Sequence, residues 1–195
     1  GSLQLELKEI RSNVVGAQLG EEAISTSLKA GAIGIALVVI FMVIFYLIPG
    51  LAAGLALVIY TLLVLLTLNA FEITLTLPGI AGIILSIGMA VDANVIIFAR
   101  IREEIAAGRN VKSAMKEGFR KAMSAIVDGN ITTLIAAAVL YLFGSGSVRG
   151  FAQTLALGIV LSMFTALVIT RLILNAFYAV GLKDKKFFGQ QKERK

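Results

Sequence analysis

The sequence predicts an all-α membrane protein with five transmembrane helices and one amphipathic helix at the cytoplasmic surface. The 195 residues are 58% hydrophobic and only 15% charged, and the mean hydropathy is +0.91. A soluble domain carries roughly 25% charged residues. The apolar residues form five runs, each close to the ~20 residues that a helix needs to cross ~30 Å of hydrocarbon. Helices are expected because a backbone in lipid must satisfy its own hydrogen bonds.

The five predicted spans cover residues 28–48, 51–70, 78–101, 126–143 and 151–179, within a transmembrane domain of residues 28–180. Pro49 and Gly50 predict a tight hairpin between the first two spans. Pro78 lies at the start of the third span, where its missing N–H costs little. The sequence Gly-Ser-Gly-Ser at 144–147 predicts a short loop before the last span.

The positions of Lys and Arg predict the topology. Seven cations lie in 100–121 and six in the basic tail 181–195, whereas loop 71–77 has none and loop 144–150 has only Arg149. The positive-inside rule therefore places 100–125 and the C-terminus in the cytoplasm and the N-terminal segment outside. This clustering accounts for the net charge of +6 without a nucleic-acid partner, and none is expected.

Residues 103–125 are expected to form the amphipathic helix that lies along the cytoplasmic interface. Apolar and small residues recur there at helical spacing, and cations occupy the remaining surface. The simpler interpretation is a membrane anchor and topology determinant. The alternative is a surface that docks onto another protein.

Asp92 is the main candidate for a functional residue. It lies in the apolar run 78–101, roughly 12 Å along the helix from Arg100 at 1.5 Å per residue. A charge at this depth costs at least ~2.5–3.5 kcal/mol, and intramembrane carboxylates are usually functional. We expect Asp92 to face a packed helix interface and to take up and release a proton. The structural alternative is a buried carboxylate that hydrogen-bonds to hydroxyls and holds helices together.

Small residues on the same predicted helix indicate close helix packing. Gly88 shares a stripe with Asp92, and Gly79, Gly82 and Ser86 form the neighbouring stripe. Asn94 points roughly away from Asp92 and is a candidate supporting polar group.

The fourth span opens with a second polar set, which contains Asp128, Asn130, Thr132 and Thr133. In the functional interpretation, Asn130, Thr132 or Thr133 meets Asp92 across a helix interface and orients it. In the structural interpretation, Asp128 caps the N-terminus of the fourth span, and the threonines bond back to the i−4 carbonyl of their own helix.

Nothing in the sequence predicts an enzyme. The chain has neither Cys nor His, which removes thiolate ligands and the usual general base. No nucleotide-binding, serine-hydrolase or zinc-protease motif is present. Neither a metal site nor a cofactor is expected.

Three segments carry a family resemblance. LTLPGIAGIILSIGMAVDANVIIFARIREE (75–104) resembles the fourth helix of the SecD family of bacterial protein-export membrane proteins, in the resistance–nodulation–division superfamily. AIVDGNITTLIAA (125–137) is similar to the fifth helix, and 15–31 resembles the junction with a large extracytoplasmic domain. The resemblance implies half of a resistance–nodulation–division transmembrane domain that lacks the first helix, with 1–27 as a remnant of the extracytoplasmic junction. Ala99 departs from the family, which often has Glu there.

The resemblance implies a subunit of the Sec translocase in the bacterial cytoplasmic (inner) membrane. Such a subunit couples a proton or sodium gradient to late steps of preprotein export, with Asp92 as the coupling residue. The implied partners are SecF, the SecYEG channel with SecA, the translocating preprotein and membrane lipid. Two alternatives stay open: a small-molecule or lipid exporter of the same superfamily, and a stabilising translocase subunit that transports nothing itself.

Overall fold

A computed structural model describes residues 17–73, 75–182 and 188. Its helices are α1 (Ala17–Tyr46), α2 (Ile48–Ala70), α3 (Leu77–Ala106), α4 (Val111–Phe143), α5 (Ser147–Phe164), the π-helix η1 (Thr165–Ile169) and α6 (Thr170–Ala179). The described part of the chain contains no strand. Five helical segments in it are long and apolar enough to span a membrane, the last running through α5, η1 and α6. The predicted all-α class with five spans is therefore confirmed.

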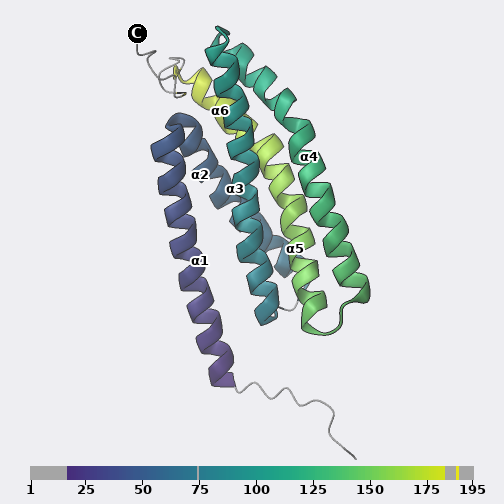
Figure 1. The fold of residues 1–195 in the computed structure, drawn as a ribbon. Coiled ribbons are helices and arrows are strands. Elements are labelled where there is room, and N and C mark those ends of the chain that lie inside the picture. The colour runs from purple at the N-terminus through teal and green to yellow at the C-terminus, as the bar shows by residue number, and fades with distance from the viewer. Residues whose placement is uncertain (1–16, 74, 183–187, 189–195) are drawn as a thin grey trace, which may run out of the picture.

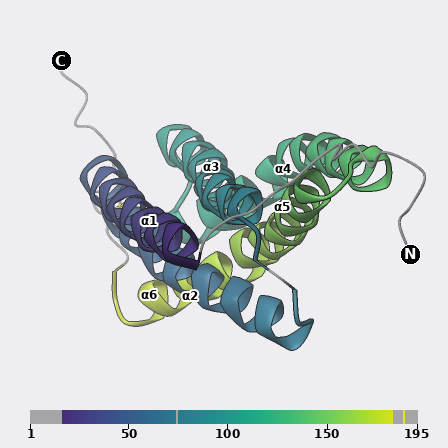
Figure 2. The same ribbon diagram turned by 90° about the horizontal axis from the view of Figure 1, so that it is seen from below.

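The helices form an up-and-down bundle with α3 near its middle (Figures 1 and 2). The α1–α2 hairpin lies on one side of α3, and α4 and α5 lie on the other. Helix α3 packs most extensively on α5 and α4, while the end of the chain around α6 returns to α2. The buried core follows these contacts, and large apolar side chains on the outside of α1, α2 and α4 are exposed.

The first two helices are joined by a turn of a single residue. Leu47 has a positive φ of 52° and Pro49 lies in the first turn of α2, where its missing N–H is tolerated. A Cβ at Gly50 would collide with the backbone of Met42. The hairpin predicted at Pro49 and Gly50 is confirmed, and glycine is required there because the two backbones meet.

Local sequence signals also determine where α3 begins. The Thr76 side chain caps the helix by accepting a hydrogen bond of 3.1 Å from the backbone N–H of Gly79. Pro78 lies in the first turn, as predicted. Helix α3 then continues to Ala106, past the predicted end at residue 101.

The separate interfacial helix predicted over 103–125 is wrong. Residues 103–106 end α3, and residues from Val111 onward form one unbroken helix with the fourth span. Asn110 caps this helix by accepting a hydrogen bond of 2.8 Å from the N–H of Ser113. No turn-forming sequence separates the basic segment, residues 111–125, from the span that follows it, so the helix continues. Its 33 residues extend about 50 Å, well beyond the hydrocarbon.

The basic segment packs on the end of α3 instead of lying alone. Its apolar stripe is buried, and a Cβ at Gly118 would lie 2.5 Å from the Ile101 side chain. The buried Glu104 carboxylate binds Arg109 at 2.8 Å and Lys121 at 2.5 Å. The amphipathic pattern therefore serves a helix–helix contact within the chain.

Two other predicted boundaries differ from the structure. Helix α1 begins at Ala17, so the expected boundary at residues 27 and 28 lies within a helix. The rest of the predicted junction, 1–16, and most of the basic tail, 183–187 and 189–195, lie outside the described residues.

Candidate functional site

Asp92 lies on the exposed side of α3, near the middle of the helix. It borders a groove of about 390 Å³ between α1 and α3. The rest of the groove is lined by Leu37, Val38, Phe41, Gly88, Val91 and Val95. Within the described part of the chain, the Asp92 carboxylate makes no hydrogen bond or ion pair. The molecule therefore presents one unpaired carboxylate in an otherwise apolar groove.

The prediction that a packed helix interface covers Asp92 is wrong within this chain. Gly88, expected in helix packing, is also exposed, and a Cβ there would meet no atom within 4 Å. The reason is that α3 turns a different face, which carries Gly79, Gly82 and Ser86, toward α5. An unpaired carboxylate is expensive to bury against apolar helices, so the small residues take the buried face.

Gly79, Gly82 and Ser86, the small residues of the predicted packing stripe, are all buried and lie against α5. A Cβ at Gly82 would lie 2.6 Å from the Thr154 hydroxyl and 3.0 Å from the Phe151 carbonyl. The Thr154 hydroxyl donates a hydrogen bond of 3.0 Å to the Gly79 carbonyl. Small residues let these two helices approach until side chain and backbone meet.

Asn94 is buried on the face of α3 that turns away from Asp92, as predicted. Its side-chain amide nitrogen, Nδ2, donates to the Ala90 backbone carbonyl at 3.3 Å. Its side-chain oxygen, Oδ1, accepts a hydrogen bond of 2.9 Å from the hydroxyl of Thr170, the first residue of α6. The Thr170 hydroxyl also lies 3.3 Å from the carbonyl of Thr165, which begins η1. Asn94 thus ties the helix that carries Asp92 to a π-helical turn, a feature frequent at functional sites.

The polar set of α4 bonds within its own helix. Asp128 accepts a hydrogen bond of 3.0 Å from Ser124, and Asn130 donates to the Ile126 carbonyl at 2.7 Å. Thr132 and Thr133 both donate to the Gly129 carbonyl, at 2.8 and 3.1 Å. Thr133 bonds back to the i−4 carbonyl, as the structural interpretation expected, whereas Thr132 bonds to the i−3 carbonyl.

Two expectations for this set fail. Asp128 is not an N-terminal cap, because α4 begins at Val111, 17 residues earlier. None of the four residues bonds to Asp92 within the described chain. Asp128 and Thr132 are exposed instead. The expected contact does not form because α4 continues through the basic segment, which fixes the rotation of the whole helix against α3.

Sequence reasoning missed a set of buried hydroxyls in the bundle. The Tyr60 and Ser86 hydroxyls share a hydrogen bond of 2.7 Å, and a Cβ at Gly158 would collide with Ser86. Thr165 and Thr170 in the last span are also buried. The available signal was the recurrence of Ser and Thr at 154, 162, 165 and 170 in a run that otherwise reads as uniformly apolar.

Five long apolar helices packed as an antiparallel bundle define a multi-pass membrane protein. Residues 2–179 match the family described as "Protein export membrane protein SecD/SecF, C-terminal". The chain belongs to this family.

Curated relatives agree with this assignment. The "Protein translocase subunit SecD" of Acidaminococcus fermentans is 50% identical over 97% of this chain and 46% of its own length. The protein of the same name from Synechocystis is 52% identical over 89% of this chain and 37% of its own length. The chain thus spans less than half the length of these relatives.

A solved structure supports the fold. The crystal structure of SecDF, "a translocon-associated membrane protein", from Thermus thermophilus aligns with a TM-score of 0.83 at 42% sequence identity. The alignment covers 86% of this chain and 23% of that one.

Proposed function

We propose that the chain is the transmembrane part of a Sec translocase subunit that couples a proton or sodium gradient to late steps of preprotein export. Its relatives carry the name of protein translocase subunits. The single observation that carries the coupling role is the unpaired Asp92 carboxylate in the groove between α1 and α3. Asp92 is the proposed coupling residue, and Asn94, two residues further along α3, is the proposed supporting polar group.

The depth of Asp92 supports this role. It lies 15 residues from Leu77 and eight from Arg100, or about 22 Å and 12 Å along the helix. Both distances leave the short side chain inside the hydrocarbon, where an idle charge would cost several kcal/mol. A carboxyl group that is protonated in one state and ionised in another gives a reason for keeping it there.

The exposed face that carries Asp92 is the proposed interface with a second membrane subunit of the SecF type. Pairing there would remove the carboxylate from lipid and bring it polar partners that the described residues do not supply. The further proposed partners are SecYEG with SecA, the translocating preprotein and membrane lipid. We place the N-terminal segment outside and the C-terminus in the cytoplasm of the bacterial inner membrane, because the cations cluster in 100–121.

The gradient supplies enough energy for this mechanism. One charge that crosses 100 mV yields about 2.3 kcal/mol, which shifts a two-state equilibrium about 50-fold. Protonation of Asp92 removes the charge that holds polar partners at the interface. The helices then repack between two arrangements, and α1 passes the movement to residues that precede it.

The test is preprotein translocation in membrane vesicles that contain the complete complex with Asp92→Asn. The gradient-dependent part of translocation should be lost and the ATP-driven part kept, because the amide cannot ionise. Glu72→Gln, an exposed carboxylate between α2 and α3, is the matched control and should behave as the parent. Undiminished gradient dependence with normal co-purification would favour the stabilising subunit and refute coupling through Asp92.

A further inference from the structure

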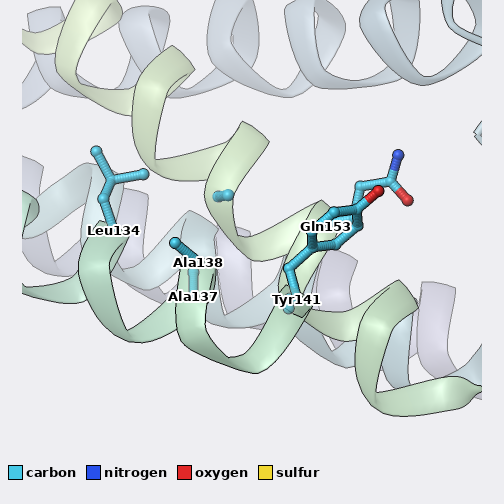
Figure 3. A pocket seen from close by; sticks show the side chains of 7 residues that line it. Leu134, Ala137, Ala138, Tyr141 and Gln153 are labelled. Atoms are coloured by element: carbon cyan, nitrogen blue, oxygen red, sulfur yellow. The ribbon is translucent and has the colours of Figure 1, made fainter. Parts of the chain in front are cut away.

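A second groove lies between α4 and α5, on the other side of α3 from the groove that Asp92 borders. It has a volume of about 460 Å³ and is almost entirely apolar. It is lined by Leu134, Ala137, Ala138, Tyr141, Ala152, Gln153 and Ala156 (Figure 3). The hollow exists because four of these seven residues are alanines, which leave space where larger side chains would fill the surface between the two helices.

The groove runs inward from one end of the bundle. Tyr141 and Gln153 lie near the hairpin that joins α4 to α5, and Leu134 lies about 10 Å deeper along α4 (Figure 3). Exposed apolar side chains follow the same stretch of α4, namely Val139, Leu142 and Phe143. The groove therefore extends from the membrane interface into the hydrocarbon.

A guanidinium group stands beside the outer end of the groove. Arg149 donates from Nε to the Tyr141 carbonyl at 3.1 Å, and its Cζ lies 5.5 Å from the centre of the Tyr141 ring. Its two terminal nitrogens make no hydrogen bond with the described residues. A planar pair of free N–H donors matches a phosphate group in a bidentate manner.

We infer that this groove binds an anionic phospholipid in the leaflet that holds the α4–α5 hairpin. One acyl chain occupies the apolar hollow, and the lipid phosphate pairs with Arg149. The charge of Arg149 complements an anionic headgroup, whereas the hollow itself offers only apolar contact. A helix of another protein, about 10 Å across, could insert only single side chains between α4 and α5. A chain of methylene groups can follow the groove along its whole length.

Native mass spectrometry of the full chain, with any membrane subunit that co-purifies, tests this inference. The protein is delipidated and titrated with phosphatidylglycerol or with phosphatidylcholine of the same acyl chains. The parent should bind phosphatidylglycerol about fivefold more tightly at one site, the preference expected for one cation near an anionic lipid. Arg149→Gln should abolish that preference. Ala138→Phe, which fills the hollow, should remove the binding event.

Two matched variants separate this site from general effects. Ala136→Phe adds the same ring at an exposed position two residues away on α4, and Lys29→Gln removes an exposed cation of α1. Lys29 lies in the first half of α1, which begins at the same end of the bundle as α5 (Figure 1). Both variants should bind lipid as the parent does. Equal losses in the matched variants would overturn the inference. A photo-cross-link from position 153 to another polypeptide instead of lipid would also overturn it.

Discussion

At the scale of single residues, the buried face of α3 depends on the absence of side chains at particular points. Gly158 of α5 lies against Ser86, whose hydroxyl donates to the Ile83 carbonyl at 2.8 Å while it also contacts Tyr60. A methyl group at Gly158 would displace this pair. Gly88 lies on the same helix as Ser86 but faces open space. Gly158 and Gly88 both lie in apolar helices, but only Gly158 is required for helix packing.

Gly158→Ala should destabilise the bundle by about 1–3 kcal/mol, the usual cost of overpacking a core. Gly88→Ala should be neutral or stabilising by up to about 1 kcal/mol, because alanine favours the helix and meets no atom. Unfolding titrations in mixed detergent measure both changes. Equal stability of the two variants would contradict the packing described for Ser86.

At the scale of elements, the end of the α3–α4 hairpin is fixed by a buried carboxylate between two cations. Glu104 is 4% exposed, whereas its neighbour Glu103 is exposed and pairs with Arg100 at 2.7 Å. Because Arg109 and Lys121 come from the loop and from α4, Glu104 joins three segments. This contact holds the basic part of α4 against the end of α3.

Glu104→Gln should lower the free energy of unfolding by about 1.5–3 kcal/mol, the range for hydrogen bonds to charged groups. Glu103→Gln should change it by less than about 1 kcal/mol, because exposed ion pairs contribute little. The same detergent titrations compare these adjacent substitutions. Equal effects of the two substitutions would show that Glu104 does not join α3 to α4 as described.

At the scale of the whole molecule, the bond between Asn94 and Thr170 connects the third span to the last one across 76 residues. It lies beside the π-helical turn and two residues from Asp92. A rearrangement of α3 that follows a change of charge at Asp92 would have to keep or break this bond. Asn94 therefore ties the helix that carries Asp92 to the last span.

A double-mutant cycle with Asn94→Ala and Thr170→Val should give a coupling energy of about 0.6 kcal/mol and at most about 1.7 kcal/mol, the average and the maximum for hydrogen bonds between membrane helices. Thr61→Val supplies the comparison, because the Thr61 hydroxyl bonds to the Leu57 carbonyl of its own helix. Its coupling to Asn94 should be near zero. Zero coupling between Asn94 and Thr170 would show that the bond does not hold α3 to α6.

The sequence by itself determined the number of spans, their order and the turns between them. Runs of apolar residues and the signals at Pro49, Gly50, Thr76 and Pro78 act locally, so each is readable from its neighbours alone. The small-residue face of α3 was also predictable, because close packing requires Gly, Ser or Ala at helical spacing.

Only the tertiary structure decided which helix face meets which. Asp92 and Gly88 lie outside the contact, and the polar set of α4 bonds to itself, because the fit of α3 against α5 and the continuation of α4 past residue 125 fix the helix rotations. Those rotations depend on the summed packing of residues far apart in the chain. A local pattern of polar and apolar residues does not contain that information.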